Sequence, residues 1–358
     1  MTQTPKRLLV AASGTGGHLF PAIATAGCLD DSHIEWLGVP DRLETQLVPQ
    51  QYRLHTVAVG GFQGKPGLRT LLTVGRLAAS VLKVRTLLKT GNFQGVFTTG
   101  GYIAAPAILA ARSLGLPVVL HESNALPGKV TRWLAPQCTR VAIGFAEAAP
   151  YLPKAKTAVV GTPVRPSFTT NETEPLPFAI PEDAPVVVVV GGSQGAVAVN
   201  RLVRAAAPAW FEAGVWVVHL TGTQDPEADS LEHPQYMAMP FFDNMAALLR
   251  RADLAVSRAG AGTLTELAIT GTPAILIPYP YAAEDHQTYN GKVFADRGAA
   301  VMIRQGDLTA AELESKVLYL LQSATVLSRM KEDARSLAVV DSANRLADLV
   351  RAVIAEKT

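Results

Sequence analysis

The chain has 358 residues, which is too long for one ordinary compact core and predicts roughly two domains. Hydrophobic residues make up 48% of it and charged residues 17%, a composition that excludes a disordered or nucleic-acid-coating protein. The formal net charge of +2 is too small for bulk electrostatic binding of DNA or RNA, so no nucleic-acid partner is expected.

The N-terminus, the hydropathy and the cysteines bear on the cellular compartment of the chain. The segment MTQTPKRLLVAA has a short apolar run, which Ser13 and the following glycines end too early for a signal peptide. No run approaches the roughly 18 apolar residues of a spanning helix, so the chain is expected to be soluble or to lie on a membrane surface. Cys28 and Cys138 lie far apart in apolar surroundings and are expected to be reduced, buried thiols.

Short runs rich in β-branched residues recur along the first half of the chain. They alternate with stretches rich in Ala, Leu and Arg at helical spacing. This alternation predicts a parallel sheet with helices on both faces. The predicted strands are 7–12, 34–38, 95–99, 117–122, 140–144 and 157–161.

The second half of the chain repeats this organisation. A polar, proline-rich segment at 170–185 predicts an interdomain linker before it. The run VVVVVGG is apolar on both faces, as an interior parallel strand must be. Amphipathic helices are predicted at 309–323 and 343–357. The predicted strands are 186–192, 215–222, 236–241, 254–260, 273–280 and 299–303.

These patterns predict an α/β protein with two doubly wound, Rossmann-like domains at 1–163 and 164–340. The C-terminal helix, about 341–358, is expected to pack back on the first domain. Ligands of such sheets bind at the carboxyl ends of the strands. Two such domains facing each other would enclose a cleft.

The first strand runs into the glycine-rich loop GTGGH, in which Gly14, Gly16 and Gly17 allow a ligand to approach backbone amides. As a dinucleotide fingerprint the loop is incomplete, because the third glycine should fall where Leu19 stands. The acidic residue expected at the end of the second strand is also missing, since Glu35 opens that strand. Both departures count against a nicotinamide cofactor.

Three further loops combine glycine with a predicted helix start. They are FTTGGYIAAP at 97–106, VVVGGSQGAVAVN at 188–200 and SRAGAGTLTEL at 257–267. Helix packing alone can require such glycines, but GTGGH and the first two of these loops, divided between two domains, favour a ligand or ligand pair with more than one phosphate. Glu266 in the last loop has two interpretations, since it either complements the helix dipole or accepts hydrogen bonds from a ribose diol.

Seven motifs occur in order across nearly the whole chain: GTGGHLFPA, GGYIAAP, HESNALPG, GTPVR, GGSQGA, RAGAGTLTE and DHQTYN. Together they resemble the MurG family, the bacterial UDP-N-acetylglucosamine–N-acetylmuramyl-(pentapeptide) pyrophosphoryl-undecaprenol N-acetylglucosamine transferases. The resemblance implies the GT-B fold, with an N-terminal acceptor domain and a C-terminal UDP-GlcNAc domain. It also implies an inverting transfer of GlcNAc to the 4-hydroxyl of MurNAc in lipid I, giving lipid II, at the cytoplasmic face of the plasma membrane.

The resemblance assigns the donor site position by position. Asn124 would reach the sugar, Phe242 would read the uracil edge through its backbone, and Gln287 would read the GlcNAc hydroxyls. The 261–266 segment would supply amides to the phosphates, with Glu266 on the ribose. The implied donor contacts are Thr15, Gly16, Gly17, Asn124, Arg165, Ser193, Phe242, Ala261, Gly262, Thr263, Leu264, Thr265, Glu266 and Gln287. Gly100, Gly101 and Tyr102 would bind the acceptor.

The chemistry of sugar transfer fits these residues without a metal. No aspartate pair has the Asp-x-Asp spacing that holds a metal-bound diphosphate, so helix N-termini, loop amides and Arg165 are expected to balance its charge. No cofactor is expected, and UDP-GlcNAc is a co-substrate. His18, at a helix start, is the preferred candidate for the base that takes the acceptor proton. A lone histidine there can instead cap or pack, and His121 with Glu122 is the rival candidate.

Three positions depart from the family pattern: Ser123 replaces a frequent glutamine, Ala259 a common serine, and NGK the usual asparagine-alanine after the glutamine motif. None removes a main ligand. They put the fine geometry of the site in question and leave the predicted activity unchanged.

One long segment carries charge of a single sign. From Thr45 to His121 there is no aspartate or glutamate, but there are eight lysines and arginines. Between 65 and 89, basic and apolar positions alternate at helical spacing, which either gives a solvated helix face or an interfacial patch on anionic lipid. The second interpretation suits an acceptor whose lipid tail stays in the membrane. Partners in a cell-wall synthesis complex are implied by the resemblance alone.

Alternative functions share parts of this pattern. Another GT-B transferase, such as a glucosyl-lipid or galactolipid synthase, would use similar loops with a different acceptor, and Gln287 and Asn124 favour an N-acetylhexosamine. A UDP-GlcNAc 2-epimerase would have the same architecture. A non-catalytic UDP-sugar-binding protein would keep the C-terminal loops and need neither His18 nor the GGY loop.

Overall fold

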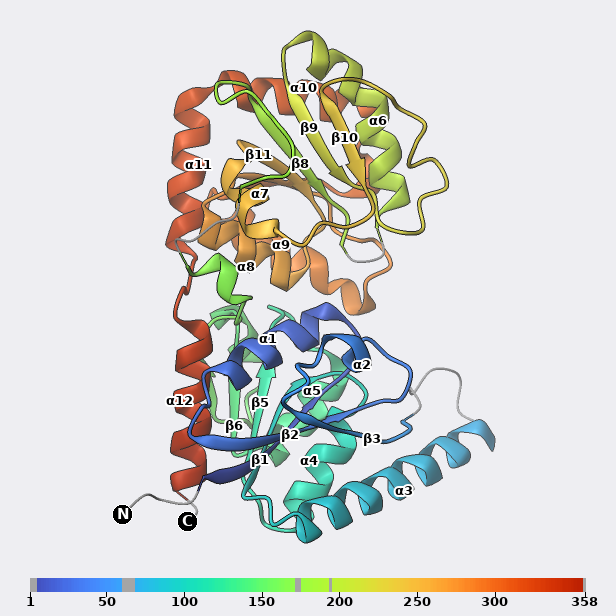
Figure 1. The fold of residues 1–358 in the computed structure, drawn as a ribbon, viewed down its shortest axis with the longest axis vertical. Helices are drawn as coiled ribbons and strands as arrows, with labels where there is room; N and C mark the ends of the chain where they lie inside the picture. Colours follow the sequence, from blue (N-terminus) through green and yellow to red (C-terminus); the bar gives the residue numbers. More distant parts are fainter. Residues whose placement is uncertain (1–4, 60–67, 171–174, 193–194, 357–358) are drawn as a thin grey trace. The chain divides into compact units, whose positions relative to one another are not determined.

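The computed structural model describes residues 5–59, 68–170, 175–192 and 195–356. The chain forms two compact units. The first unit comprises Met1–Arg165 and Asp341–Thr358, and the second comprises Pro166–Val340. Figure 1 shows both units as sheets covered by helices.

The first unit is built on a parallel sheet. Among its described residues, seven strands lie in the order β3-β2-β1-β4-β5-β6-β7. The central strands are apolar on both faces, as strands covered by helices on two sides must be; β5, for example, is buried along its whole length. The strands are β1 (Lys6–Ala12), β2 (Ser32–Gly38), β3 (Arg53–Thr56), β4 (Gly95–Gly100), β5 (Val118–Glu122), β6 (Arg140–Ile143) and β7 (Thr157–Val159).

Helices cover both faces of this sheet. One face packs Leu9, Val96 and Leu120 against α3, α4 and α5. The other packs Leu8 and Val10 against α1 and α12. The helices are α1 (Gly16–Gly27), α2 (Glu44–Leu47), α3 (Leu68–Thr90), α4 (Ala104–Ser113), α5 (Lys129–Leu134) and α12 (Ser342–Ala355), with 3-10 turns η1 (Ala135–Gln137) and η2 (Ala146–Tyr151).

The C-terminal helix α12 is tied to the first unit at both ends. Near its start, Ser342 Oγ donates to the carbonyl of Thr162 at 3.1 Å. Near its end, Arg351 donates to the carbonyl of Cys28 at 2.6 Å and pairs with Asp31 at 3.1 Å. Its apolar stripe closes the core between these ends, because Leu346, Ala347, Val350, Val353 and Ile354 are all buried.

The second unit repeats the architecture. Its described strands lie in the order β10-β9-β8-β11-β12-β13, all parallel. They are β8 (Val186–Val190), β9 (Trp216–Leu220), β10 (Tyr236–Met239), β11 (Leu254–Ser257), β12 (Ala274–Leu276) and β13 (Ala300–Met302). Both sheets therefore follow the strand order of dinucleotide-binding folds, with the first strand beside the point where the order reverses.

The helices of the second unit enclose its sheet. Helices α6 and α10 pack on one face through a core that includes Val187, Val217 and Trp210, and α8 packs against α7, α9 and α11. They are α6 (Val197–Glu212), α7 (Met245–Arg251), α8 (Ala261–Thr270), α9 (His286–Ala295), α10 (Ala310–Gln322) and α11 (Ala324–Ser336), with 3-10 turns η3 (Pro166–Phe168), η4 (Ala283–Asp285) and η5 (Gln305–Asp307).

The predicted strands are all present, with ends shifted by a few residues, and two doubly wound parallel-sheet units are confirmed. The edge strand β3 was not predicted, because RLHT has no apolar run. The linker prediction at 170–185 is wrong, since this segment belongs to the second unit. Arg251 donates to the carbonyls of Pro181 and Ala184 and so fastens the segment to α7.

Within the described residues, no helix combines the length and the apolar character required to cross a bilayer.

Candidate active site

The predicted glycine loops lie where such sheets bind ligands. In the first unit the loops at 13–17 and 100–103 follow β1 and β4, and in the second the loops at 191–195 and 258–260 follow β8 and β11. Each pair flanks the point where the strand order reverses. This edge is the usual ligand site of open parallel sheets.

A buried carboxylate holds the first loop. Gly14 adopts a φ of 103°, and its N–H donates to Glu44 Oε2 at 3.2 Å. Glu44 Oε1 accepts the N–H of Val39 at 2.7 Å, and the side chain is fully buried. One loop amide is therefore occupied by the protein itself. The predicted donor contacts Thr15, Gly16 and Gly17 follow it at the start of α1, where they are half-buried or exposed.

His18 is fixed in one orientation and one tautomer. Its Nδ1 lies 2.8 Å from the carbonyl oxygen of Thr99, and Thr99 Oγ1 donates to the carbonyl of His18 at 2.7 Å. A carbonyl can only accept, so the neutral ring carries its proton on Nδ1 and a lone pair on Nε2. Gly100 makes room for this ring, because an added Cβ would lie 3.1 Å from His18 Cε1. The half-buried imidazole can accept a proton at Nε2.

The rival pair is engaged inside the protein. His121 is 1% exposed, its Nε2 bonds to the carbonyl of Gly161 at 2.9 Å, and burial lowers its pKa. Glu122 accepts the backbone N–H and the side-chain amide of Asn124, and its other oxygen accepts the N–H of Gly128. Together they shape the 122–128 loop and orient Asn124, whereas His18 keeps a nitrogen for chemistry.

The GGY loop packs tightly on the end of β1. Gly101 adopts a φ of 79°, and an added Cβ there would lie 2.4 Å from the carbonyl oxygen of Ser13. Among the residues that the structure describes, the buried Ser13 hydroxyl has no hydrogen-bond partner. Tyr102 is 41% exposed, with the Arg42 guanidinium 6.0 Å from its ring centroid. The loop therefore presents backbone and an exposed aromatic ring at the end of β4, beside the loop that holds His18.

Arg165 is placed against the first glycine loop. Its guanidinium lies 5.1 Å from the centroid of the Phe20 ring on α1. Gly16 lies directly against that ring, since an added Cβ would lie 2.8 Å from Phe20 Cε2. Stacking fixes the half-buried guanidinium near the start of α1, a geometry suited to phosphate.

The N-terminus of α8 has the properties of an anion site. Gly260 supplies no side-chain cap, so the first amides of the helix, at 261–263, have no partner inside it. Leu264 is fully buried and Thr265 Oγ1 donates to the carbonyl of Ala261, so these two side chains serve the helix. Glu266 is half-buried one turn further on.

Neutral and cationic side chains hold the loop at 258–260, which precedes α8. Gln287 Oε1 accepts the N–H of Ala259 at 3.2 Å and that of Tyr279 at 2.9 Å, which leaves its Nε2 hydrogens for a ligand. Asn290 Nδ2 donates to the carbonyl of Ala259. Arg258 donates to the carbonyl of Ile277 at 3.0 Å. Burial lowers the pKa of Arg258 to about 10, so the guanidinium stays charged at neutral pH.

The remaining predicted donor residues lie in other loops. Phe242 follows β10 and is half-buried, with its ring 5.8 Å from that of Phe178. Ser193 lies outside the described residues, between Gly191 and Gly195 at the end of β8. The structure thus groups the predicted residues in loops at the carboxyl edges of the two sheets.

Sequence analysis missed the side chains that support these loops. Glu44 has no motif around it, and its role depends on a contact with Gly14, 30 residues away. Asn200 closes the segment VVVGGSQGAVAVN and Arg204 lies beyond it, and neither was assigned a role. No group of three or more His, Cys, Asp or Glu side chains within 5–59, 68–170, 175–192 and 195–356 could hold a metal ion.

Both units match domain models of one enzyme family. Residues 8–143 match the glycosyltransferase family 28 N-terminal domain, and residues 186–346 match the glycosyltransferase family 28 C-terminal domain. The two matches together cover most of the chain and include the loops described above, apart from Arg165.

Similar proteins carry a specific name. A Nostoc sp. UDP-N-acetylglucosamine–N-acetylmuramyl-(pentapeptide) pyrophosphoryl-undecaprenol N-acetylglucosamine transferase is 65% identical over 355 residues, covering 99% of each chain. The Synechococcus elongatus protein of the same name is 58% identical, covering 99% of this chain and 100% of its own. The crystal structure of Acinetobacter baumannii MurG superposes with a TM-score of 0.79 at 30% identity, covering 97% of this chain and 99% of its own. A putative UDP-N-acetylglucosamine 2-epimerase from Listeria monocytogenes shares the fold, with a TM-score of 0.70 at 12% identity.

Proposed function

The chain belongs to glycosyltransferase family 28, and we propose that it transfers GlcNAc from UDP-GlcNAc to the 4-hydroxyl of MurNAc in undecaprenyl-pyrophosphoryl-MurNAc-pentapeptide. This reaction converts lipid I to lipid II in peptidoglycan synthesis. The observation that carries the proposal is the 65% identity, over 99% of the chain, to a relative named for this activity.

A single displacement accounts for the chemistry. The 4-hydroxyl oxygen attacks the anomeric carbon of GlcNAc, its proton passes to His18 Nε2, and the bond from the sugar to UDP breaks with its electrons on the diphosphate. Attack from the face opposite the leaving group inverts the α linkage to β. The Nδ1 bond to Thr99 keeps the lone pair of His18 on Nε2, which supports His18 as the base.

The second unit carries most of the donor site. The first amides of α8 bind the diphosphate, the Glu266 carboxylate accepts the ribose hydroxyls, and Gln287 Nε2 donates to GlcNAc. The backbone of Phe242 reads uracil. On the first unit, the proposed donor contacts are Thr15, Gly16, Gly17, Asn124 and Arg165.

The acceptor binds in the first unit. Gly100 and Gly101 bring bare backbone to the end of β4, next to His18. Tyr102 offers an exposed ring for a sugar face. The buried hydroxyl of Ser13 lies against Gly101 and needs a partner. These features support a pyrophosphoryl sugar on the GGY loop.

Transfer proceeds without a protein-bound metal. Helix N-terminal amides and Arg165 supply the positive charge that a divalent ion provides in other transferases. Turnover should therefore be unchanged by excess chelator. Loss of all activity in chelator, with recovery on adding a divalent ion, would contradict this assignment.

One helix layer of the first unit forms the membrane surface. Helices α3, α4 and α5 share one face of the sheet, and their exposed apolar side chains include Leu82 and Trp133, each 64% exposed. Between Glu44 and Glu147 the only acidic residue is Glu122, which is buried. The layer thus offers apolar and basic side chains with no exposed carboxylate, which suits the anionic cytoplasmic face of the plasma membrane. Its exposed basic residues are Arg76, Lys83, Arg85, Lys89, Arg112 and Lys129. Residues 65–67 of the predicted basic stretch lie outside the described residues.

Charge reversal tests the membrane surface. The triple variant Arg76→Glu, Lys83→Glu, Arg85→Glu should lose binding to vesicles that contain anionic lipid and keep UDP affinity. The matched control reverses Arg297, Lys316 and Arg329, which are exposed on the second unit. Equal vesicle binding by both variants would exclude the α3–α5 surface.

The activity itself is tested with purified protein, radiolabelled UDP-GlcNAc and a short-chain lipid I analogue. One β-linked disaccharide product should form for each UDP released. Release of UDP without disaccharide would contradict the proposed reaction, and formation of a 2-epimer of the sugar nucleotide would assign the chain to another class.

A further inference from the structure

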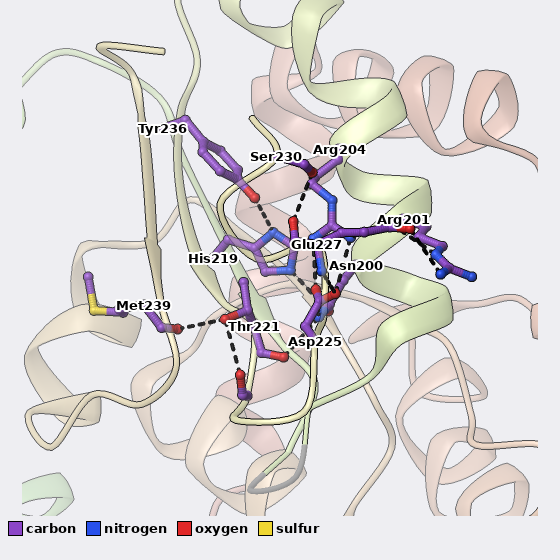
Figure 2. Close-up of polar contacts among 11 residues, drawn as sticks. Asn200, Arg201, Arg204, His219, Thr221, Asp225, Glu227, Ser230, Tyr236 and Met239 are labelled. Carbon is purple, nitrogen blue, oxygen red and sulfur yellow. Dashed lines mark hydrogen bonds and ion pairs between the residues drawn. The ribbon is translucent and has the colours of Figure 1, made fainter. Parts of the chain in front are cut away.

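A cluster of buried polar side chains supports the loop that follows β9. The cluster consists of Asn200 and Arg204 on α6, His219 on β9, Asp225 in the loop and Tyr236 on β10 (Figure 2). We refer to it as the α6–β9 cluster.

An ion pair forms one half of the cluster. Arg204 Nη1 lies 2.7 Å from Asp225 Oδ2, and the two side chains are 7% and 0% exposed. Burial alone raises the pKa of Asp225, but hydrogen bonds from Arg204 and Asn200 outweigh it, so its pKa lies below the usual value. Arg204 also pairs with Glu227 at 3.1 Å. Asp225 therefore anchors the loop, because separating it from Arg204 would leave an unpaired buried charge at a high cost in free energy.

Neutral groups with fixed roles form the other half. Asn200 Nδ2 donates to the carbonyl of Thr221 at 2.8 Å and to Asp225 Oδ2 at 2.7 Å. Asn200 Oδ1 is left to accept from His219 Nε2 at 3.0 Å, so His219 Nδ1 accepts from the Tyr236 hydroxyl at 2.7 Å. Burial lowers the pKa of His219 to about 3, which keeps the ring neutral at working pH.

The α6–β9 cluster fixes the loop that follows β9, and this loop contacts both the loop after β8 and the end of β10. Gly195, at the end of the loop after β8, approaches Thr221 so closely that an added Cβ would lie 2.2 Å from the Thr221 carbonyl oxygen. The Thr221 N–H donates to the carbonyl of Met239, at the end of β10, at 3.0 Å. Beyond this anchored base, Thr223 and Gln224 are exposed.

Stability alone is a weak reason for such an arrangement. Replacing a buried ion pair by well-packed apolar residues is often neutral or stabilising, so a gain in stability does not account for the Arg204–Asp225 pair. What the α6–β9 cluster achieves is a loop of fixed conformation with two hydrogen-bonding side chains at its tip. A loop fixed before its ligand arrives binds with a smaller entropy loss.

We propose that residues 221–225 form a further binding loop for the uridine diphosphate part of the donor, with Thr223 and Gln224 as contacts and Asn200 as a positioning residue. This rests on the donor site proposed above. In the sheet, β9 lies between β8 and β10, whose loops hold the proposed donor contacts. A nucleotide that reaches both loops passes over the end of β9.

The test compares UDP affinity and steady-state kinetics of the full chain with those of three variants. The double variant Thr223→Ala, Gln224→Ala removes the tip and should raise the Kd for UDP about tenfold, the loss expected for one or two hydrogen bonds. Asn200→Ala should raise the Kd for UDP and the KM for UDP-GlcNAc by a similar factor. The kcat and the KM for the lipid acceptor should stay within twofold in both.

Arg201→Ala is the matched control. Arg201 lies on the same helix and pairs with Glu227 at 3.0 Å, and the two side chains are 57% and 42% exposed. Glu227 contacts Asp225 through its backbone N–H, which this substitution retains. UDP affinity of this variant should equal that of the wild type.

Wild-type UDP affinity in the double variant Thr223→Ala, Gln224→Ala would overturn the proposal. This outcome remains decisive if Asn200→Ala fails to fold, because Thr223 and Gln224 lie on the surface and their replacement should not disturb folding. A change in acceptor KM or kcat alone would overturn it as well. If the wild type itself neither binds UDP nor transfers GlcNAc, the proposed function fails first, and the two failures are thereby distinguished.

Discussion

The two units place glycine-rich loops at the same point of the same strand order, but they hold these loops with different charges. In the first unit, the loop at 13–17 gives its Gly14 amide to the buried carboxylate of Glu44. In the second unit, the loop at 258–260 is held by the amides of Gln287 and Asn290 and by the cation of Arg258. A positive charge beside a loop favours a phosphate and a negative charge opposes one. In the first unit, the Arg165 guanidinium, stacked on Phe20 of α1, offsets the charge of Glu44.

The same contrast separates two histidines. His18 uses one ring nitrogen for a carbonyl and keeps Nε2 for a proton. His219 uses both ring nitrogens inside the α6–β9 cluster. The same residue type is therefore available for the proposed chemistry in the first unit and supports a loop in the second. This contrast fits the proposed function, in which the first unit supplies the base and the second supplies most of the donor diphosphate contacts.

Replacing His18 should break the first half of this comparison most strongly. His18→Ala should lower turnover about 10²- to 10⁴-fold, the usual contribution of a general base, while UDP affinity stays within twofold. The measurements are disaccharide formation at saturating substrates and UDP binding by calorimetry. His33→Ala, at an exposed histidine of the same unit, is the control and should keep full turnover. Near wild-type turnover of His18→Ala would remove His18 as the base.

Replacing Glu266 should break the second half. Glu266→Ala removes the carboxylate that we propose to accept the ribose hydroxyls and should raise the Kd for UDP about 10- to 100-fold, since hydrogen bonds to charged groups contribute about 1.5–3 kcal/mol. The kcat at saturating UDP-GlcNAc should change much less. The control, Glu314→Ala on α10, lies outside the proposed site. If Glu266→Ala binds UDP as the wild type does, Glu266 only complements the helix dipole.

A substitution of Glu44 sharpens the role of the buried carboxylate. Glu44→Gln keeps the shape but turns an N–H₂ group toward a backbone N–H that needs an acceptor, at a cost of about 1–3 kcal/mol. We expect a lower melting temperature and lower turnover, because the loop carries His18, with unchanged UDP affinity. Thermal unfolding and kinetics on one preparation check this. A variant with wild-type stability would show that the carboxylate does not hold the loop.

Acid should reveal the neutral histidine of the second unit. The pKa of His219 is lowered to about 3 in the folded chain, so between about pH 6.5 and pH 3 this imidazole is protonated in the unfolded chain and neutral in the folded chain. The contribution of neutral His219 to the free energy of unfolding is fully present above pH 6.5. It is lost as the pH falls toward 3, at up to about 1.4 kcal/mol per pH unit. Urea unfolding at several pH values should therefore give a shallower acid slope for His219→Gln than for the wild type. Equal slopes would contradict a buried neutral His219.

Local signals explain how much of this molecule was predictable. Apolar runs such as VVVVVGG and the glycines after them locate strands and loops within a few residues, so both sheets and their carboxyl edges, where ligands of such sheets usually bind, follow from the sequence. The edge strand at Arg53–Thr56 lacks such a run and pairs through its backbone with β2.

The supports of the loops were not predictable, because they depend on contacts between distant residues. Glu44 reaches Gly14 across 30 residues, and Arg204 reaches Asp225 across 21. A glutamate or an arginine in an amphipathic helix carries no sign of its partner. The segment at 170–185 likewise has linker composition, and distant side chains, among them Arg250 and Arg251, fasten it to the second unit.

Turnover and UDP affinity measured side by side on His18→Ala and Glu266→Ala give the most direct test of the division of labour between the units. We predict opposite losses: His18→Ala loses kcat and keeps UDP affinity, and Glu266→Ala loses UDP affinity and keeps most of kcat at saturating donor. Full kcat in His18→Ala, or wild-type UDP affinity in Glu266→Ala, would contradict it.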